Sequence, residues 1–412
     1  MIRTLALITL LCLTSVRVSA QTLRGAWIVC TRDLQLRETL IDRFDQRELV
    51  LRNAYGIRSS VPMGEVLFVV RSEPLRQVRP DQIAGAPAPE PSPVRLITLR
   101  DGQVVRGSII EPGVPDELAI SLIAGRHVHG EAHIPLERVM RVVDQDAERA
   151  YAPGEELLDD VVITRTGDRI AGFIEALGPV TRIVQAGGPE LEIETQRIES
   201  ILIANTPTRE PGIYLGFSDR EVLRAVSIEY EPQQPISIEV DAGSLGLSDT
   251  GNTLWVFDAG SLRSLHVVRP ALRVLALGQL TPARIEATGD RGWAPAPTPL
   301  DRGTNHPALG SLDLHSPVRL TYRLPEGTNR FAAGIEAPIE QWTDCVLRVL
   351  AVSGSDERVL FEQRLNRDMP AAELNTAIPA GTDELVIEID PGEYGPIQDR
   401  VLLHRARLLV QD

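Results

Sequence analysis

The chain has 412 residues and a net charge of −15, from 42 basic and 57 acidic side chains. It contains no lysine, so every basic residue is an arginine. Without lysine, Schiff-base enzymes, pyridoxal-phosphate anchors and P-loop nucleotide sites are excluded. The acidic composition argues against nucleic-acid binding, which needs a basic surface, so we expect no nucleic-acid partner.

Residues 1–20 have the composition of a secretory signal peptide. Arg3 supplies a short basic region, residues 5–13 are apolar, and Val18-Ser19-Ala20 is a small-residue cleavage site. The apolar stretch is too short to span a bilayer as a helix. No later stretch is apolar for long enough either, so we expect no membrane insertion. The sequence therefore predicts an exported bacterial protein, either periplasmic or extracellular.

Two cysteines, Cys30 and Cys345, follow the predicted signal peptide and lie near opposite ends of the chain. A disulfide between them would require the first and last domains to touch. The alternative that we favour is two small buried thiols. Two cysteines are too few for a disulfide scaffold or a thiolate zinc site.

A weak internal repeat organises the first two thirds of the chain. Residues 101–109 and 166–174 each place a glycine turn between alternating apolar runs, which is a hairpin pattern. Similar short sequences stand near the end of each copy, at residues 61–66, 134–139 and 193–198. Units of about fifty residues bury small cores, so we expect small β-barrels that pack against their neighbours. The predicted repeats span residues 22–71, 94–145 and 159–205, with a diverged fourth copy at 213–268.

The opening hairpin of each copy resembles the first hairpin of SH3-like and Sm-like barrels. The resemblance covers about a dozen residues in each copy. It implies the small-barrel fold but not the nucleic-acid role of Sm proteins, because the basic and aromatic residues needed for that role are absent.

Two segments rich in proline, residues 80–93 and 291–307, predict extended linkers. Helical periodicity is scarce, and we expect a helical turn only at residues 34–40 and 370–374.

The last hundred residues show repeated apolar–polar alternation, as in Val318, Leu320 and Tyr322. Seven or eight such strands separated by proline and glycine turns predict an antiparallel sandwich over residues 305–411. The predicted fold class is therefore all-β: tandem small β-barrel repeats followed by a C-terminal antiparallel, jelly-roll-like β-sandwich.

Short motifs in this last region occur in the order found in the NPCBM family. They are residues 309–316 (LGSLDLHS), 320–324 (LTYRL) and 330–336 (RFAAGIE), then Asp399 and residues 406–408. The region resembles this family of carbohydrate-binding modules, which often stand beside glycosidase domains. The resemblance implies a β-sandwich that binds carbohydrate, and a structural role for the matching histidine, His315, in tying the first strand to the last.

The sequence departs from the family pattern at three places. The usual Asp after Gly-Ile is Glu336, the usual Val-Asp-Gly turn is residues 352–354 (VSG), and a Trp near the end is Leu403. These departures bear on the ligand more than on the fold.

Sugar-binding sandwiches stack sugar faces on exposed aromatic rings and bind hydroxyls with carboxylates. Trp342 lies in an expected loop and Tyr394 in a Pro-Gly turn, so these rings are the candidate platform. The alternative is that both rings plug the ends of the sandwich. Glu393 and Asp399 are the candidate carboxylates, and with Asp390 they also suggest a weaker alternative, a calcium site.

Other chemistry has less support in the sequence. His127, His129 and His133 have spacing that could place two imidazoles near one metal, but surface histidines are the commoner reading. No G-x-S-x-G, H-E-x-x-H or C-x-x-C motif is present. We therefore expect no catalytic residues, no metal and no cofactor, and a protein that is not an enzyme.

The sequence as a whole predicts an exported, non-catalytic protein that binds a polysaccharide or envelope glycan through its C-terminal sandwich. The alternative is a structural protein of the bacterial cell envelope whose domains contact other proteins and bind no sugar.

Overall fold

The computed structural model describes residues 26–72, 94–125, 127–145, 157–208, 210–247, 251–287, 294–300, 309–338, 342–396 and 398–411. The expected signal peptide at 1–20 and the expected linker at 80–93 lie outside these residues. The described regular structure consists of β-strands and short 3₁₀ turns, which confirms the all-β class. Within the described ranges, no helix has the length and apolar character to cross a membrane.

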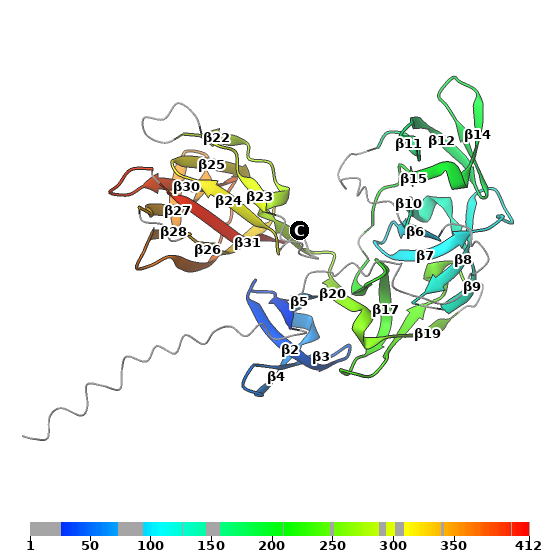
Figure 1. The fold of residues 1–412 in the computed structure, drawn as a ribbon, viewed down its shortest axis with the longest axis horizontal. Coiled ribbons are helices and arrows are strands. Elements are labelled where there is room, and N and C mark those ends of the chain that lie inside the picture. Colours follow the sequence, from blue (N-terminus) through cyan, green and yellow to red (C-terminus); the bar gives the residue numbers. More distant parts are fainter. Residues whose placement is uncertain are drawn as a thin grey trace, which may run out of the picture.

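Four units, each of five strands with a 3₁₀ turn before the fifth strand, precede the sandwich (Figure 1). The first unit contains β1 (Trp27–Thr31), β2 (Leu36–Phe44), β3 (Glu48–Arg52), β4 (Arg58–Pro62), η1 (Met63–Glu65) and β5 (Val66–Arg71). The second contains β6 (Val94–Leu99), β7 (Val104–Ile109), β8 (Glu117–Ala124), β9 (His127–Pro135), η3 (Leu136–Arg138) and β10 (Val139–Asp144). The third contains β11 (Asp160–Thr164), β12 (Arg169–Leu177), β13 (Val180–Val184), β14 (Glu190–Glu194), η4 (Thr195–Arg197) and β15 (Ile198–Leu202). The fourth contains β16 (Gly212–Phe217), β17 (Val222–Glu229), β18 (Ile236–Asp241), η5 (Gly243–Leu245), β19 (Asn252–Phe257), η6 (Ala259–Ser261) and β20 (Leu262–Val268).

The same strand pairing recurs in all four units. The first four strands form an antiparallel meander, and the fifth strand returns to pair with the first, as β5 does with β1. In the second and third units the first hairpin turns at Gly102 and Gly167, whose φ angles of 89° and 92° lie in the region that favours glycine. One apolar core cluster extends through all four units.

The units join through their fifth strands. β5 of the first unit pairs antiparallel with β20 of the fourth, and β10 of the second pairs with β15 of the third. The central pairs are Val69 with Leu265 and Val142 with Ile201, and each of these residues is the sixth after the first residue of its 3₁₀ turn. The two joints therefore share one register. The four units form a single 20-stranded sheet, so separate closed barrels, as expected from the sequence, are not established.

In each unit, the 3₁₀ turn that precedes the fifth strand is capped by a side chain from the partner unit. Arg95 donates to backbone carbonyls at η4, Asn205 to carbonyls at η3, Arg269 to carbonyls at η1 and Arg71 to a carbonyl of η6. Buried carbonyl groups need such donors, because an unpaired polar group in a core is costly. The caps therefore add to the strand pairing at both joints.

Two antiparallel sheets form the C-terminal sandwich (Figure 1). One sheet has the order β23-β24-β31-β26-β29, with β21 also paired to β31, and the other has the order β22-β25-β30-β27-β28. Inward-facing apolar side chains of both sheets form the second large core. The elements are β21 (Leu272–Ala276), η7 (Leu277–Gln279), β22 (Arg284–Glu286), β23 (Thr298–Leu300), β24 (Ser311–His315), β25 (Val318–Arg323), β26 (Thr328–Glu336), β27 (Asp344–Ser353), β28 (Asp356–Asn366), β29 (Ala371–Ala377), β30 (Glu384–Pro391) and β31 (Arg400–Gln411).

Several expected boundaries differ from the structure. β23 lies inside residues 291–307, which were expected to be a linker, and β21 and β22 add strands to the sandwich before residue 305. The helical turns expected at residues 34–40 and 370–374 are wrong, because these residues belong largely to β2 and β29. Pairing with neighbouring strands decides these segments, and local propensity does not reveal such partners.

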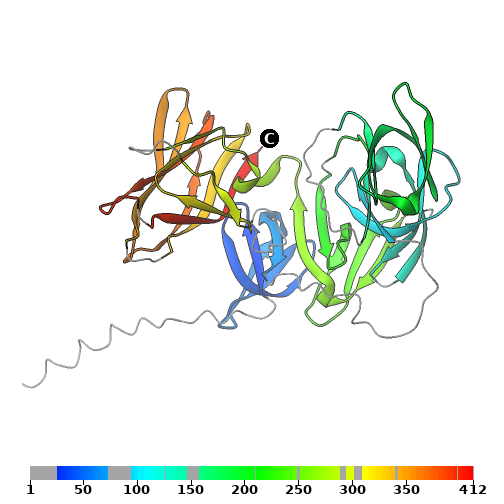
Figure 2. The same cartoon turned by 45° about the horizontal axis from the view of Figure 1, so that its top comes forward.

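The first unit packs against the β31 sheet of the sandwich (Figure 2). Cys30 and Leu34 share an apolar cluster with Ala332 and Leu409. Arg407 of β31 donates to the Leu34 carbonyl. The first and last domains therefore touch, as a disulfide would have required. Cys30 and Cys345 are nevertheless both free and buried, since Cys345 lies on β27 in the opposite sheet.

Candidate functional sites

The structure brings the two aromatic rings expected to form a platform into contact. Trp342 lies in the loop before β27 and Tyr394 in the loop after β30. Their ring centroids are 5.4 Å apart and their planes meet at 67°, an edge-to-face arrangement. The backbone N–H of Trp342 donates to Gln398 Oε1 at 3.1 Å, which joins the two loops. The rings are 42% and 50% exposed, so they do not fill the interior of the sandwich.

Charged groups hold the Tyr394 loop in place. Arg364 donates two hydrogen bonds of 2.7 Å to the Asp344 carboxylate, which also accepts the Glu393 backbone N–H at 2.8 Å. The guanidinium of Arg364 holds the pKa of Asp344 below its usual range. A Cβ at Gly392 would lie 2.3 Å from the Asp344 carbonyl oxygen, so only glycine fits there. The loop therefore has a defined position beside the rings.

The two candidate carboxylates have different surroundings. Glu393 is exposed beside Tyr394. Asp399 is only 3% exposed and accepts the Asp344 backbone N–H at 3.0 Å. Its other carboxylate oxygen has no hydrogen-bond partner among the described residues, and burial raises its pKa to about 6. Asp399 thus supports the loops from below the surface.

Neither metal-site alternative has support from the described residues. Asp390 forms an ion pair with Arg348, so its carboxylate is engaged away from Glu393 and Asp399. The side chains of His127 and His129 lie outside the described residues, while His133 Nδ1 is 3.5 Å from a carboxylate oxygen of Glu117. The described side chains contain no group of three histidine, cysteine, aspartate or glutamate residues placed to hold a metal ion.

The resemblance implied that His315 ties the first strand of the sandwich to the last. In the structure this contact is made mainly by Asp313 and Arg400. The His315 imidazole lies 3.6 Å from Asp313 and is half exposed. Asp313 accepts two hydrogen bonds of 2.7 Å from Arg400, which joins β24 to β31.

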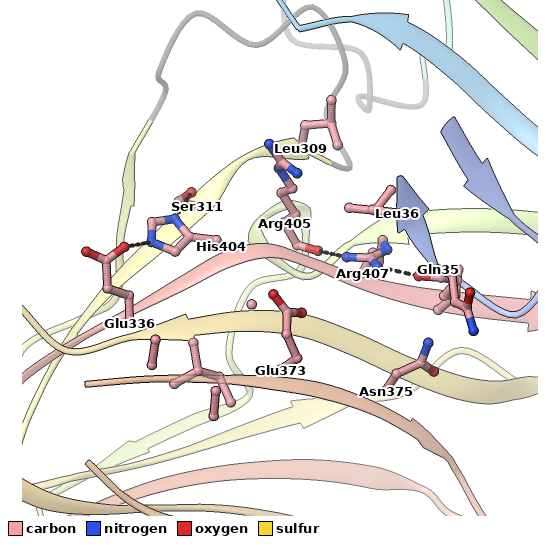
Figure 3. Close-up of a pocket in the computed structure, with 15 residues that line it drawn as sticks. Gln35, Leu36, Leu309, Ser311, Glu336, Glu373, Asn375, His404, Arg405 and Arg407 are labelled. Carbon is pink, nitrogen blue, oxygen red and sulfur yellow. Dashed lines mark hydrogen bonds and ion pairs between the residues drawn. The ribbon is translucent and has the colours of Figure 1, made fainter. Parts of the chain in front are cut away.

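A second candidate site is a pocket of about 910 Å³ where the first unit meets the sandwich (Figure 3). Its floor comes from β24, β26, β29 and β31, and its side wall comes from the segment that enters β2. Figure 3 shows polar side chains from both domains around the same space. The lining residues are Leu34, Gln35, Leu36, Leu309, Ser311, Gly334, Ile335, Glu336, Ala371, Ala372, Glu373, Asn375, His404, Arg405 and Arg407.

One wall of the pocket is a hydrogen-bonded row of three side chains (Figure 3). His404 Nε2 lies 2.9 Å from a Glu336 carboxylate oxygen, and His404 Nδ1 lies 3.0 Å from Ser311 Oγ. Because the carboxylate can only accept, we assign the imidazole proton to Nε2, and Nδ1 then accepts the serine hydroxyl proton. The row therefore presents oxygen acceptors to the pocket.

Two charged side chains of the pocket are not engaged in a described hydrogen bond or ion pair, although the charge of one of them, Glu373, acts on Arg407. In the described part of the chain, neither Glu373 nor Arg405 makes a side-chain hydrogen bond or ion pair. Arg405 has a φ angle of 54° at a bulge in β31, where the pairing with β26 shifts register. A non-glycine residue in this region costs energy, and such residues cluster at functional sites. The bulge places the Arg405 side chain at the pocket (Figure 3).

The sequence reasoning missed this pocket. Alternation along the strands could have placed Gly334 with Glu336, and Glu373 with Asn375, on shared faces. Of these, only Glu336 was singled out, as a departure from a family pattern. Recognising the pocket requires the order of strands in the sheet and the docking of a domain that begins three hundred residues earlier.

Comparisons with known proteins give structural similarities only. No protein-family model and no curated protein sequence matches the chain. A CBM51 module from Clostridium perfringens, solved with methyl-galactose, is 14% identical with a TM-score of 0.26, and the match covers 33% of this chain and 99% of that one. A CBM6 module from Clostridium stercorarium, solved with cellobiose, is 11% identical with a TM-score of 0.20, covering 34% and 92%. A tandem CBM22 pair from Paenibacillus barcinonensis is 10% identical with a TM-score of 0.24, covering 79% and 100%. At these values the matches do not bear on ligand or mechanism.

Proposed function

We propose that this protein binds a polysaccharide or envelope glycan on the sandwich, at the exposed Trp342–Tyr394 pair. The observation behind the proposal is that two aromatic rings from different loops meet at the surface, half exposed, instead of completing the core. Aromatic rings supply large apolar contact for the C–H faces of sugars at low entropic cost. An edge-to-face pair offers two such surfaces at an angle, which suits a bent chain of sugar units.

The neighbouring polar groups supply the directional part of this site. Glu393 is exposed next to Tyr394, and Arg364 is fixed by Asp344 with its guanidinium at the edge of the same loop. Carboxylates accept from sugar hydroxyls and guanidinium groups donate to them. Asp399 acts indirectly in this proposal, by holding the loops.

Replacing Trp342 or Tyr394 by alanine is expected to weaken glycan binding about 5- to 150-fold. Each ring supplies a stacking surface, and one such contact contributes about 1–3 kcal/mol, by analogy with base stacking on aromatic side chains. The measurement is affinity electrophoresis of the chain through gels containing soluble polysaccharides, with titration calorimetry for any that retard it. Tyr55→Ala is the matched control, because Tyr55 is 80% exposed in a turn of the first unit. Retardation that survives both platform substitutions would refute this site.

The units before the sandwich act in this proposal as spacers or protein-contact modules, folded as small barrels joined through their fifth strands, in an exported protein.

A protein-contact role without sugar binding is the second candidate. It is favoured by Phe173, which is 68% exposed and pairs across strands with the partly exposed Val184. Phe173→Ser would then abolish co-purification of an envelope protein, whereas sugar competition would not.

A further inference from the structure

We propose that the pocket between the first unit and the sandwich is a second saccharide site, which takes one or two units of a short neutral sugar. The ligand class is that of the proposed function, but the residues are different, so either site can fail without the other.

Glu373 and Arg405, neither of which makes a hydrogen bond or ion pair through its side chain among the described residues, define the ligand chemistry. A carboxylate and a guanidinium facing one pocket complement a group that both donates and accepts. Adjacent hydroxyls of a sugar do this, since one can donate to Glu373 while the next accepts from Arg405. The opposite wall adds the free carboxylate oxygen of Glu336 and the Ser311 oxygen, both oriented by His404.

The polar groups of the pocket are held before any ligand arrives. Asn375 is fixed between the Asp33 carbonyl, to which it donates at 2.9 Å, and Arg330, from which it accepts at 2.9 Å. Arg407 is 5% exposed and donates to the carbonyls of Leu34 and Arg405, which fixes its guanidinium between the two domains.

The charge and size of the pocket favour a neutral sugar. Glu336 and Glu373 balance Arg405 and Arg407, so the lining has no net formal charge with His404 neutral. The volume of about 910 Å³ lies within the range typical of small-ligand sites. Leu36 and Ala371, which are not buried, can cover the C–H face of a ring without an aromatic platform. Such a pocket encloses a chain end or a short branch, whereas the Trp342–Tyr394 pair is open to the middle of a chain.

The pocket also links binding to domain contact. Residues 34–36 come from the first unit, and most of the other lining residues come from the sandwich. A sugar that touches both walls binds only while the two domains are docked. Its binding free energy therefore stabilises the docked arrangement.

Gly334→Val provides the sharpest test. A Cβ at Gly334 would lie 3.5 Å from both Glu373 Oε1 and the His404 Cβ, which is ordinary contact, and the backbone there does not require glycine. Valine suits a strand, so the variant should fold while its side chain fills the pocket floor. Glu373→Ala removes the acceptor instead. The matched controls are Glu326→Ala, which removes an exposed carboxylate from the turn before β26, and Trp342→Ala at the other site.

The experiment is saturation-transfer NMR of the full chain with methyl glycosides and disaccharides of neutral hexoses and N-acetylhexosamines, followed by titration of each sugar that binds. Glycylglycine and methyl glucuronide are included as zwitterionic and anionic probes. We expect at least one neutral sugar to bind, with affinity at least tenfold weaker in Gly334→Val and Glu373→Ala and unchanged in both controls. Thermal melts confirm that the variants fold.

Three results would overturn the proposal: no neutral sugar binds the unaltered chain, the pocket variants bind as well as it does, or only a charged probe binds. Failure of the proposed function would give a different result, because polysaccharide binding would then survive the Trp342→Ala substitution. Loss on Trp342→Ala alone would support the first site and refute the second.

Discussion

Replacing Arg95 by alanine should lower the free energy of unfolding by about 1–3 kcal/mol, the range for leaving a buried hydrogen-bonding group without its partner. Arg95 is 2% exposed and donates to the carbonyls of Thr195 at 2.7 Å and Ile198 at 2.8 Å. These bonds join the second unit to the 3₁₀ turn of the third. Alanine would leave both buried carbonyls without this donor and open a cavity beside them.

Urea denaturation followed by circular dichroism measures this loss, and hydrogen exchange along β10 and β15 localises it. Arg182→Ala is the matched control, because Arg182 forms an ion pair with Glu192 in which both side chains are more than half exposed. We expect the control to change stability by about 0–1 kcal/mol. An equally small effect for Arg95→Ala would mean that the other contacts between the second and third units, such as the β10–β15 pairing and the Asn205 cap, hold this joint without Arg95.

The second large effect is that Glu221 makes the free energy of unfolding depend on pH. Glu221 is 1% exposed where the fourth unit meets the second, and burial raises its pKa from 4.5 to about 7. Arg106 and the Gly125 N–H, which lie 3.9 Å and 3.3 Å from its carboxylate oxygens, offset part of that cost, whereas Asp219 adds to it. Below about pH 4.5 the group is protonated in both states and costs nothing. Between pH 4.5 and 7 the folded protein binds more protons than the unfolded chain, so stability falls as pH rises.

Glu221→Gln removes this ionisation while keeping the shape of the side chain. The variant is expected to be more stable than the unaltered chain at pH 8, by up to about 3 kcal/mol given 1.4 kcal/mol per pKa unit. At pH 4.5 the two proteins should differ little. Denaturation curves at both pH values give the comparison, with Glu239→Gln, a partly exposed residue of β18 in the same unit, as control. A difference that does not change with pH would show that the carboxyl group titrates normally.

Much of the fold follows from patterns within single strands. The alternation of Val318, Leu320 and Tyr322 correctly indicated a strand of an antiparallel sheet, and all three side chains are buried. The repeated glycine turns at Gly102 and Gly167 indicated hairpins that the structure contains. Joining of the units into one sheet could not be predicted this way, because the pairing of Val69 with Leu265 leaves no local signal.

The two candidate sites also differ in whether local sequence could reveal them. Trp342 and Tyr394 could be proposed from the sequence because each stands in a turn, where an aromatic ring has little reason to be buried. Glu373 and Arg405 stand within strands and read as ordinary exposed positions. Their meeting depends on the bulge that turns Arg405 and on the order of β26, β29 and β31, which are properties of the assembled sheet.

The first unit pairs with the fourth, and the second and third units, which pair with each other, lie between them in the sequence. This arrangement constrains the order in which the units can assemble. The second and third units are neighbours in the sequence, so β10 gains its partner soon after it leaves the ribosome. β5 must wait for β20, about 200 residues later, which is about 10–40 s at ordinary rates of synthesis. During that time the strand Val66–Arg71, almost wholly buried in the finished molecule, has an unpaired edge. A chaperone that covers this strand until the fourth unit has been made would protect it from wrong pairing.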